Sequence, residues 1–190
     1  MIPSPVFHAR IPPRSIGLGA VAQAGLVIGA LLGMAGTFVP SAELRGLAWT
    51  IDGVALIVAT ALLAVHYLRR GDEQLAAGFL VFLAGETLIV SGSAMEFAAI
   101  APTFSAGVGL WSASLALVSA SPVMPRLVRA TGAIAAILFA VTALRIAGGA
   151  GLTPLSEPLP FFAYPFLAVT LFGWAWVHRQ STSRGAAGNP

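Results

Sequence analysis

The chain has 190 residues, of which 57% are hydrophobic and only 9% are charged. About a quarter of the residues in soluble domains are charged, so this composition excludes an ordinary soluble protein and indicates a membrane protein. One spanning helix takes roughly 20 apolar residues, so six spans leave room for short connections but none for a soluble catalytic domain. The net charge of +3 comes from arginines spread through the connecting segments, which argues against nucleic acid as a partner.

Charges, prolines and glycines divide the chain into six apolar segments, which predicts an all-α, polytopic membrane protein with a six-helix transmembrane bundle. The uncharged stretch from Ser15 to Ala42 is too long for a signal peptide, so we expect it to be retained as the first span. The expected organisation is a cytoplasmic N-terminal tail (1–15), a single transmembrane domain (16–178) and a cytoplasmic C-terminal tail (179–190). The six expected spans are 16–36, 48–68, 74–96, 105–121, 127–147 and 159–178.

The arginines predict the orientation, because cytoplasmic loops of membrane proteins carry an excess of positive residues. With the N-terminus in the cytoplasm, only Arg45 and Arg145 fall on the outer side. Both termini are therefore expected in the cytoplasm, and the protein itself in a bacterial inner membrane. The arginines expected on the cytoplasmic side are Arg10, Arg14, Arg69, Arg70, Arg126, Arg129, Arg179 and Arg184.

Glycines recur at regular spacing in two of the expected spans. Small residues at such spacing let helix backbones approach closely in a membrane, where apolar side chains gain little by leaving lipid. Each glycine ladder either packs helices within one chain or forms an interface in a homo-oligomer or a larger membrane complex. The ladders are Gly25, Gly29 and Gly33 in the first span, and Gly78, Gly85 and Gly92 in the third.

The tryptophans and tyrosines lie mainly near the ends of the expected spans. Amphipathic aromatic rings settle at the headgroup level of a bilayer, so we expect these side chains to anchor the helices there. The residues are Trp49, Tyr67, Trp111, Tyr164, Trp174 and Trp176.

Glu86 is the residue most indicative of function, because it lies near the middle of the third span. A carboxylate there costs about 2.5–3.5 kcal/mol on insertion scales, so it should face the bundle interior or water, find a partner, or be protonated. Val90 and Ser93 share its helix face by spacing. The alternative is a neutral glutamic acid that only fixes helix packing through a hydrogen bond.

A second group of charges is expected at the outer end of the bundle, where Arg145 is placed to pair with Asp52 or Glu96. Glu96 lies about 15 Å along the helix from Glu86. This group is either the entrance of a polar path to Glu86 or a belt of interfacial ion pairs with little effect on stability.

His66 and His178 lie at the cytoplasmic ends of their spans, each near arginines, and offer a weak alternative as haem ligands. We expect no metal and no cofactor. The chain has no cysteine, which excludes disulfides and thiolate chemistry, and it has no hydrolase, metalloprotease or nucleotide-binding motif. An enzyme is therefore not expected.

Two functions remain. The first is a transporter or channel-like protein for protons or a small solute that uses Glu86 in the membrane. The second is a non-catalytic accessory or assembly subunit of a larger membrane complex, docked through its glycine ladders. A polar cavity that joins Glu86 to one side of the membrane favours the first, and a dry core with Glu86 capped by a neighbour favours the second.

Overall fold

The computed structural model describes residues 17–92, 97–151 and 162–187, with side chains for all of these except 97–99 and 181–187. In these ranges the chain folds into α-helices joined by short turns. The helices are α1 (Leu18–Phe38), α2 (Ala42–Arg69), α3 (Glu73–Gly92), α4 (Phe97–Ala120), α5 (Arg126–Ala147) and α6 (Tyr164–Ala187).

Five of these helices are long and apolar enough to cross a membrane: α1, α2, α3, α5 and the Ile100–Ala120 part of α4. The prediction of an all-helical membrane protein is therefore confirmed. A sixth span and the cytoplasmic location of both termini stay predictions.

The observed helices are longer than expected at three ends. Helix α2 begins at Ala42 rather than near residue 48, because the Ser41 side chain accepts the Leu44 N–H and Glu43 occupies the first turn, where a negative charge suits the helix dipole. Helix α4 begins at Phe97 and contains Pro102, whereas the expected span began after this proline. Helix α6 continues through Ala187, well beyond the expected end at 178.

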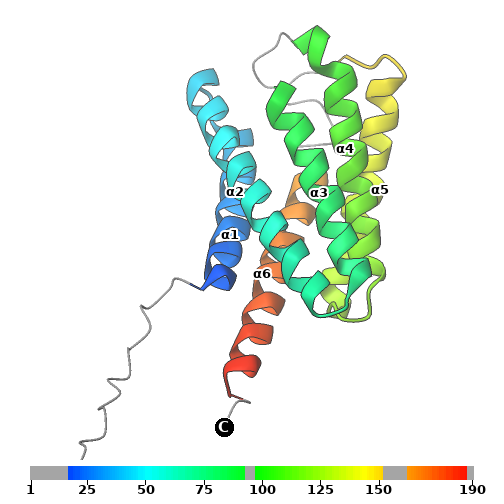
Figure 1. The fold of residues 1–190 in the computed structure, drawn as a ribbon. Coiled ribbons are helices and arrows are strands. Elements are labelled where there is room, and N and C mark those ends of the chain that lie inside the picture. The colour runs from blue at the N-terminus through cyan, green and yellow to red at the C-terminus, as the bar shows by residue number, and fades with distance from the viewer. Residues whose placement is uncertain (1–16, 93–96, 152–161, 188–190) are drawn as a thin grey trace, which may run out of the picture.

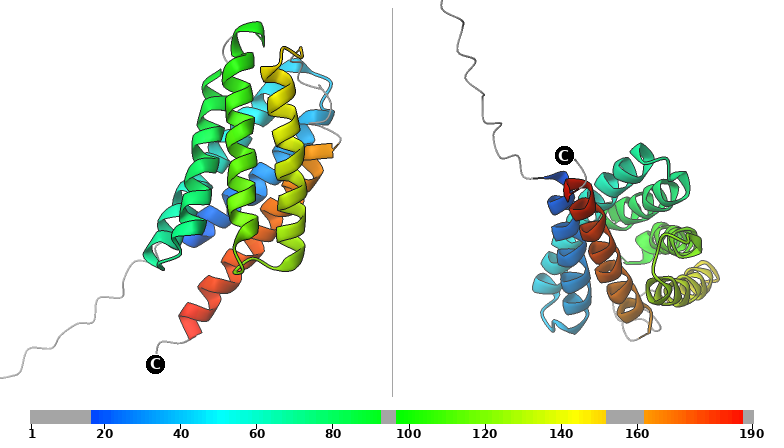
Figure 2. Two further views of the ribbon diagram at one scale, coloured as in Figure 1. Left: turned by 90° about the vertical axis from the view of Figure 1, so that its right-hand side faces the viewer. Right: turned by 90° about the horizontal axis from the view of Figure 1, so that it is seen from below.

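The helices run alternately up and down the bundle (Figure 1), and their contacts form a ring in chain order. Each helix packs on the next, and α6 closes the ring by packing on α1 as well as α5. The view along the bundle shows α6 lying between the α1–α2 pair and α5 (Figure 2).

Aromatic side chains fill the interior. Trp174 of α6 meets Phe79 and Phe82 of α3 at ring-centroid distances of 5.0 and 5.8 Å, and Phe82 stacks on Trp111 of α4. Trp111 and Trp174 are only 4% and 1% exposed, so the expectation that they anchor the helices at the membrane surface is wrong for both. Trp176, which is 60% exposed, keeps that expected role.

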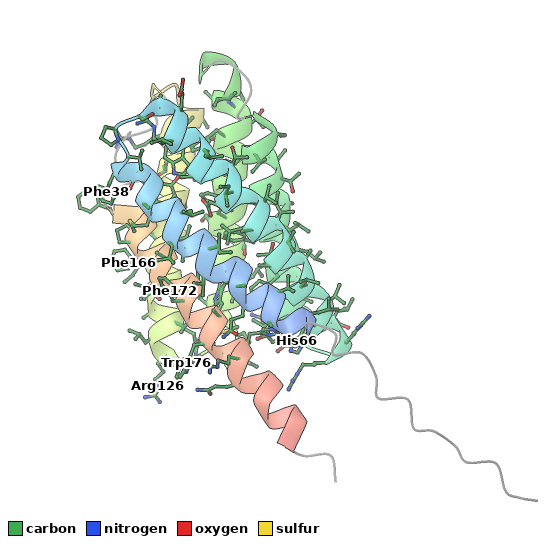
Figure 3. The ribbon with its side chains drawn as sticks, turned by 90° about the vertical axis from the view of Figure 1, so that its left-hand side faces the viewer. Phe38, His66, Arg126, Phe166, Phe172 and Trp176 are labelled. Carbon is green, nitrogen blue, oxygen red and sulfur yellow. The ribbon has the colours of Figure 1, made fainter. Side chains whose placement is uncertain are left out.

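The ends of the bundle differ in their number of arginines. The start of α1, the α2–α3 turn, the α4–α5 turn and the C-terminal part of α6 share one end (Figure 1), which places Arg69, Arg126 and Arg179 together there. His66 and Arg126 lie toward this end and Phe38 toward the opposite one (Figure 3). Arg45 and Arg145 belong to the end of Phe38, because α2 begins there and α5 finishes there.

Candidate functional site

Glu86 lies in the interior of the bundle and is 3% exposed. Its side chain points at α2, where Gly53 makes room for it: a Cβ atom at Gly53 would lie 3.0 Å from Oε1 of Glu86. Val90, one turn further along α3, presses on the same glycine. The helix face that spacing predicts for Glu86 and Val90 therefore packs on α2.

Trp111 of α4 covers the other side of Glu86. The two helices approach closely because Gly85 faces Gly107, and a Cβ atom at Gly85 would lie 2.8 Å from the Gly107 carbonyl oxygen and 3.0 Å from Cδ1 of Trp111. The Trp111 indole lies close to the Glu86 carboxyl group, although its Nε1 completes no hydrogen bond among the described residues. Glycine next to the acid thus brings an aromatic ring against it.

Asp52 of α2 is the second acid of the site. Its carboxyl group lies over the glycine ladder of α1: Cβ atoms at Gly29 and Gly33 would be 3.1 and 2.8 Å from Oδ1 and Oδ2, respectively. The Asp52 and Glu86 carboxyl groups lie within electrostatic reach of each other, so they repel each other when both are charged. Asp52 is half-buried, whereas Glu86 is buried.

The predicted pairing of Asp52 with Arg145 is not found. Arg145 is exposed on α5, which packs on α4 and α6, while Asp52 faces α1. The prediction considered only how far along its helix each residue lies. Asp52 and Arg145 point in different directions about their helix axes, which keeps the two side chains apart. Ser93 and Glu96, the other residues expected near this site, lie outside the described residues.

Tyr164, the first residue of α6, lies within electrostatic reach of both acids. Its ring contacts Trp111 and Phe139 at centroid distances of 6.5 and 6.0 Å. Four helices therefore supply the site: α2 with Asp52, α3 with Glu86, α4 with Trp111 and α6 with Tyr164.

Three buried polar atoms of this site have no hydrogen-bond partner in the described part of the chain: Oδ1 of Asp52, Oε2 of Glu86 and Nε1 of Trp111. Buried polar groups are almost always paired, and the exceptions tend to mark functional positions. Two acids this close also repel each other when both are ionised. Glu86 is thus enclosed by packed side chains, as in the dry core expected of an accessory subunit, but within the described part of the chain no neighbour caps its Oε2.

Sequence reasoning missed Trp111, Tyr164 and Gly53 as parts of the site. Both aromatic residues were assigned to the membrane surface from their places along the helices. The signal for Gly53 was available, because a glycine beside an acid within an apolar helix leaves room for a side chain from a neighbouring helix.

The glycine ladders contact neighbouring helices of the same chain. In α1, Gly25 faces Ala55 and Ala59 of α2. In α3, Gly78 faces Val118 and Gly92 faces Ile100, both of α4. These faces are therefore occupied without a second subunit.

His66 and His178 meet between α2 and α6, with ring centroids 4.7 Å apart and planes at 86°. Two axial ligands of a haem lie on opposite faces of the macrocycle, and rings in direct contact leave no space for it between them. The described residues include no group of three or more His, Cys, Asp or Glu placed to hold a metal ion. The haem alternative does not fit this arrangement.

The acid pair is suited to taking up and releasing a proton, because binding one removes a charge that is costly to bury. In comparisons with known proteins, no family model, no curated protein and no solved structure matches the chain.

Proposed function

We propose that this chain is a small multi-pass membrane protein that carries protons across the membrane, with Glu86 as the proton-binding group and Asp52 as its partner. The observation that supports this most is the pair of acids inside an apolar helical bundle, with Oε2 of Glu86 unpaired among the described residues. Intramembrane acids are costly and are functional by default.

A proton fits this site better than a larger solute. Glu86 is enclosed on one side by Gly53 and Val90 of α2 and α3 and on the other by Trp111. Phe82 stacks on Trp111 with ring planes 13° apart, so both rings are held in place. A proton needs no space beyond the carboxyl oxygen that it binds.

The arginine-rich end of the bundle supports the cytoplasmic assignment of both termini in this proposal. Cytoplasmic ends of membrane proteins carry the excess of arginine, and Arg69, Arg126 and Arg179 share one end of the bundle. The site lies nearer the opposite end, since Asp52 is about 15 Å along α2 from its start at Ala42.

The test is proton uptake into liposomes that contain the purified protein, driven by a potassium diffusion potential and followed with a trapped pH dye. The unsubstituted protein is expected to conduct protons, and Glu86→Gln is expected to reduce uptake to the level of protein-free liposomes, because an amide cannot exchange a proton in this range. Glu73→Gln is the matched control, since Glu73 is an exposed acid in the first turn of the same helix.

Equal uptake by the unsubstituted protein and Glu86→Gln would exclude Glu86 from the mechanism. Absence of uptake with every form would favour the second candidate, an accessory subunit of a larger membrane complex. The tight enclosure of Glu86 is the observation that favours this second candidate.

A further inference from the structure

One face of α2 leads from the end of the bundle to the acid pair. Arg45, Trp49 and Asp52 are spaced by four and three residues, so they lie one above another on this face. All three contact α1 or the turn that follows it. Ser41, Glu43 and Gly46 around the start of this face are exposed, so the face begins at the surface of the molecule.

The Trp49 side chain closes this face above Asp52. Its Nε1–H donates to the Gly33 carbonyl oxygen at 3.3 Å, and its ring lies against Gly36, where a Cβ atom would be 2.6 Å from Cδ1. Glycine at both positions is what lets the N–H edge of the indole approach the α1 backbone. The Asp52 carboxyl group also lies against Gly33, next to the Trp49 indole.

Arg45 packs on the Trp49 indole. Its guanidinium carbon is 5.9 Å from the centre of the Trp49 ring, which is a cation–π distance, and its Nη1–H donates to the Val39 carbonyl oxygen at 3.2 Å. The closed position of Trp49 thus depends on one hydrogen bond and one cation–π contact. Both are side-chain interactions that a rotation about the Trp49 side-chain bonds breaks without moving a helix.

The two acids differ in access, because Asp52 is half-buried and Glu86 is buried. We propose that Trp49 is the gate between the water at the α1–α2 end and the acid pair, and that Asp52 is the first acid reached when the indole swings away from Gly33. The role of Asp52 as a proton relay to Glu86 rests on the proposed function. The closure of the path by Trp49 rests on the packing alone.

Access is measured by a thiol reaction, for which this chain is well suited because it contains no cysteine. Asp52→Cys introduces a single thiol, and its rate of modification by a membrane-impermeant sulfonated methanethiosulfonate reports contact with water. Adding Trp49→Ala is expected to raise this rate about tenfold, because a hydrogen bond and a cation–π contact together favour the closed indole over the open one by roughly one power of ten, and alanine removes the closing group. Trp49→Phe, which keeps a ring but loses the N–H, is expected to fall between the two.

Trp176→Ala is the matched control, because Trp176 is an exposed tryptophan of α6 and its loss is expected to leave the rate unchanged. Equal rates with and without Trp49→Ala in the Asp52→Cys background would overturn the proposal. An equal acceleration by Trp176→Ala would overturn it as well, since the effect would then reflect general loosening of the bundle. If the alanine variant does not elute as a folded species, the thiol modification rate of the Trp49→Phe variant tests the proposal instead.

Failure of the gate and failure of proton transport are distinguishable. In the chain with both acids, Trp49→Ala is expected to raise proton uptake by liposomes, and Trp49→Ala combined with Glu86→Gln is expected to abolish it. Faster thiol modification without any proton uptake would keep the gate and refute proton transport. Proton uptake with unchanged thiol modification would keep transport and refute the gate.

Discussion

The α1–α2 and α3–α4 contacts are both built on a glycine ladder, yet the glycines do different work in each. In the α3–α4 contact, Gly85 and Gly107 face each other, and a Cβ atom on either would lie within 2.9 Å of the other's carbonyl oxygen. In the α1–α2 contact, Gly33 instead receives the Asp52 carboxyl group and the Trp49 hydrogen bond. Gly85 thus brings two backbones together, whereas Gly33, in the outer part of the α1 ladder, makes room for large polar side chains; Gly25, at the inner end of the same ladder, lies against the Ala55 carbonyl oxygen as Gly85 lies against that of Gly107.

This difference shows that a glycine ladder in the sequence predicts a close contact with a neighbouring helix. It does not predict whether the backbone or a side chain of that helix makes the contact. A backbone carbonyl cannot move aside without displacing its helix, whereas a carboxyl group at the end of a side chain can rotate away. Substitutions in the α3–α4 ladder are therefore expected to act on stability, and those in the outer part of the α1–α2 ladder on activity.

The largest effect on stability is expected for Gly85→Ala. The added methyl group would meet the Gly107 carbonyl oxygen, Leu110 and Trp111 within 3.0 Å, so α3 and α4 must separate. Overpacking of this kind costs about 1–3 kcal/mol, and we expect a loss near the middle of this range in the free energy of unfolding, measured by SDS titration in mixed micelles with circular dichroism. The control is Gly46→Ala, because a Cβ atom at this helical position meets nothing within 4 Å.

If Gly85→Ala unfolds at the same SDS fraction as Gly46→Ala, the close approach of α3 and α4 contributes nothing to stability. The proposed difference between the two ladders would then be wrong for the α3–α4 contact, where the larger effect on stability is expected.

The sequence predicted the helical membrane fold well, because the evidence is carried by local apolar runs and by the charges that interrupt them. The turn at Arg69 and Arg70 lies between α2 and α3 as expected. The start of α2 was missed, because Glu43 and Arg45 suggested a loop while the Ser41 cap allows the helix to include them. Charge alone does not end a helix that extends beyond the apolar layer.

The candidate site was predicted in part. Glu86 stands out in the sequence because its burial is costly wherever its helix packs. Asp52 was expected at the outer end of the bundle, grouped with Arg145 and Glu96, because position along a helix is readable from sequence, but rotation relative to five other helices is not. The position of Trp111 beside Glu86 was missed for the same reason. The Gly85–Gly107 contact that brings Trp111 there joins residues from two helices, and their relative rotation is not readable from sequence.

A smaller effect on stability, together with a clear effect on activity, is expected for Gly33→Ala. The added methyl group would lie 2.8 Å from Oδ2 of Asp52, and the carboxyl group must rotate away. We expect a loss of about 1 kcal/mol in the free energy of unfolding, because a side-chain end yields more easily than a backbone. Proton uptake by liposomes is expected to fall well below that of Gly46→Ala, since Asp52 no longer lies beside Glu86.

Unchanged uptake with Gly33→Ala would mean that the position of Asp52 over α1 does not matter for transport. A stability loss as large as that of Gly85→Ala would instead show that the α1–α2 contact is as unyielding as the α3–α4 contact.

The smallest effect is expected for Gly92→Ala at the end of α3. A Cβ atom there would lie 3.6 Å from Cβ and Cγ2 of Ile100, an ordinary van der Waals distance that requires no movement. Alanine is favoured over glycine in a helix by about 1 kcal/mol, and at the last residue of α3 we expect part of this gain, with proton uptake unchanged. A loss of stability in the SDS titration would show that α3 and α4 need a glycine even where there is space for a methyl group, so that the whole ladder, and not only Gly85, sets their separation.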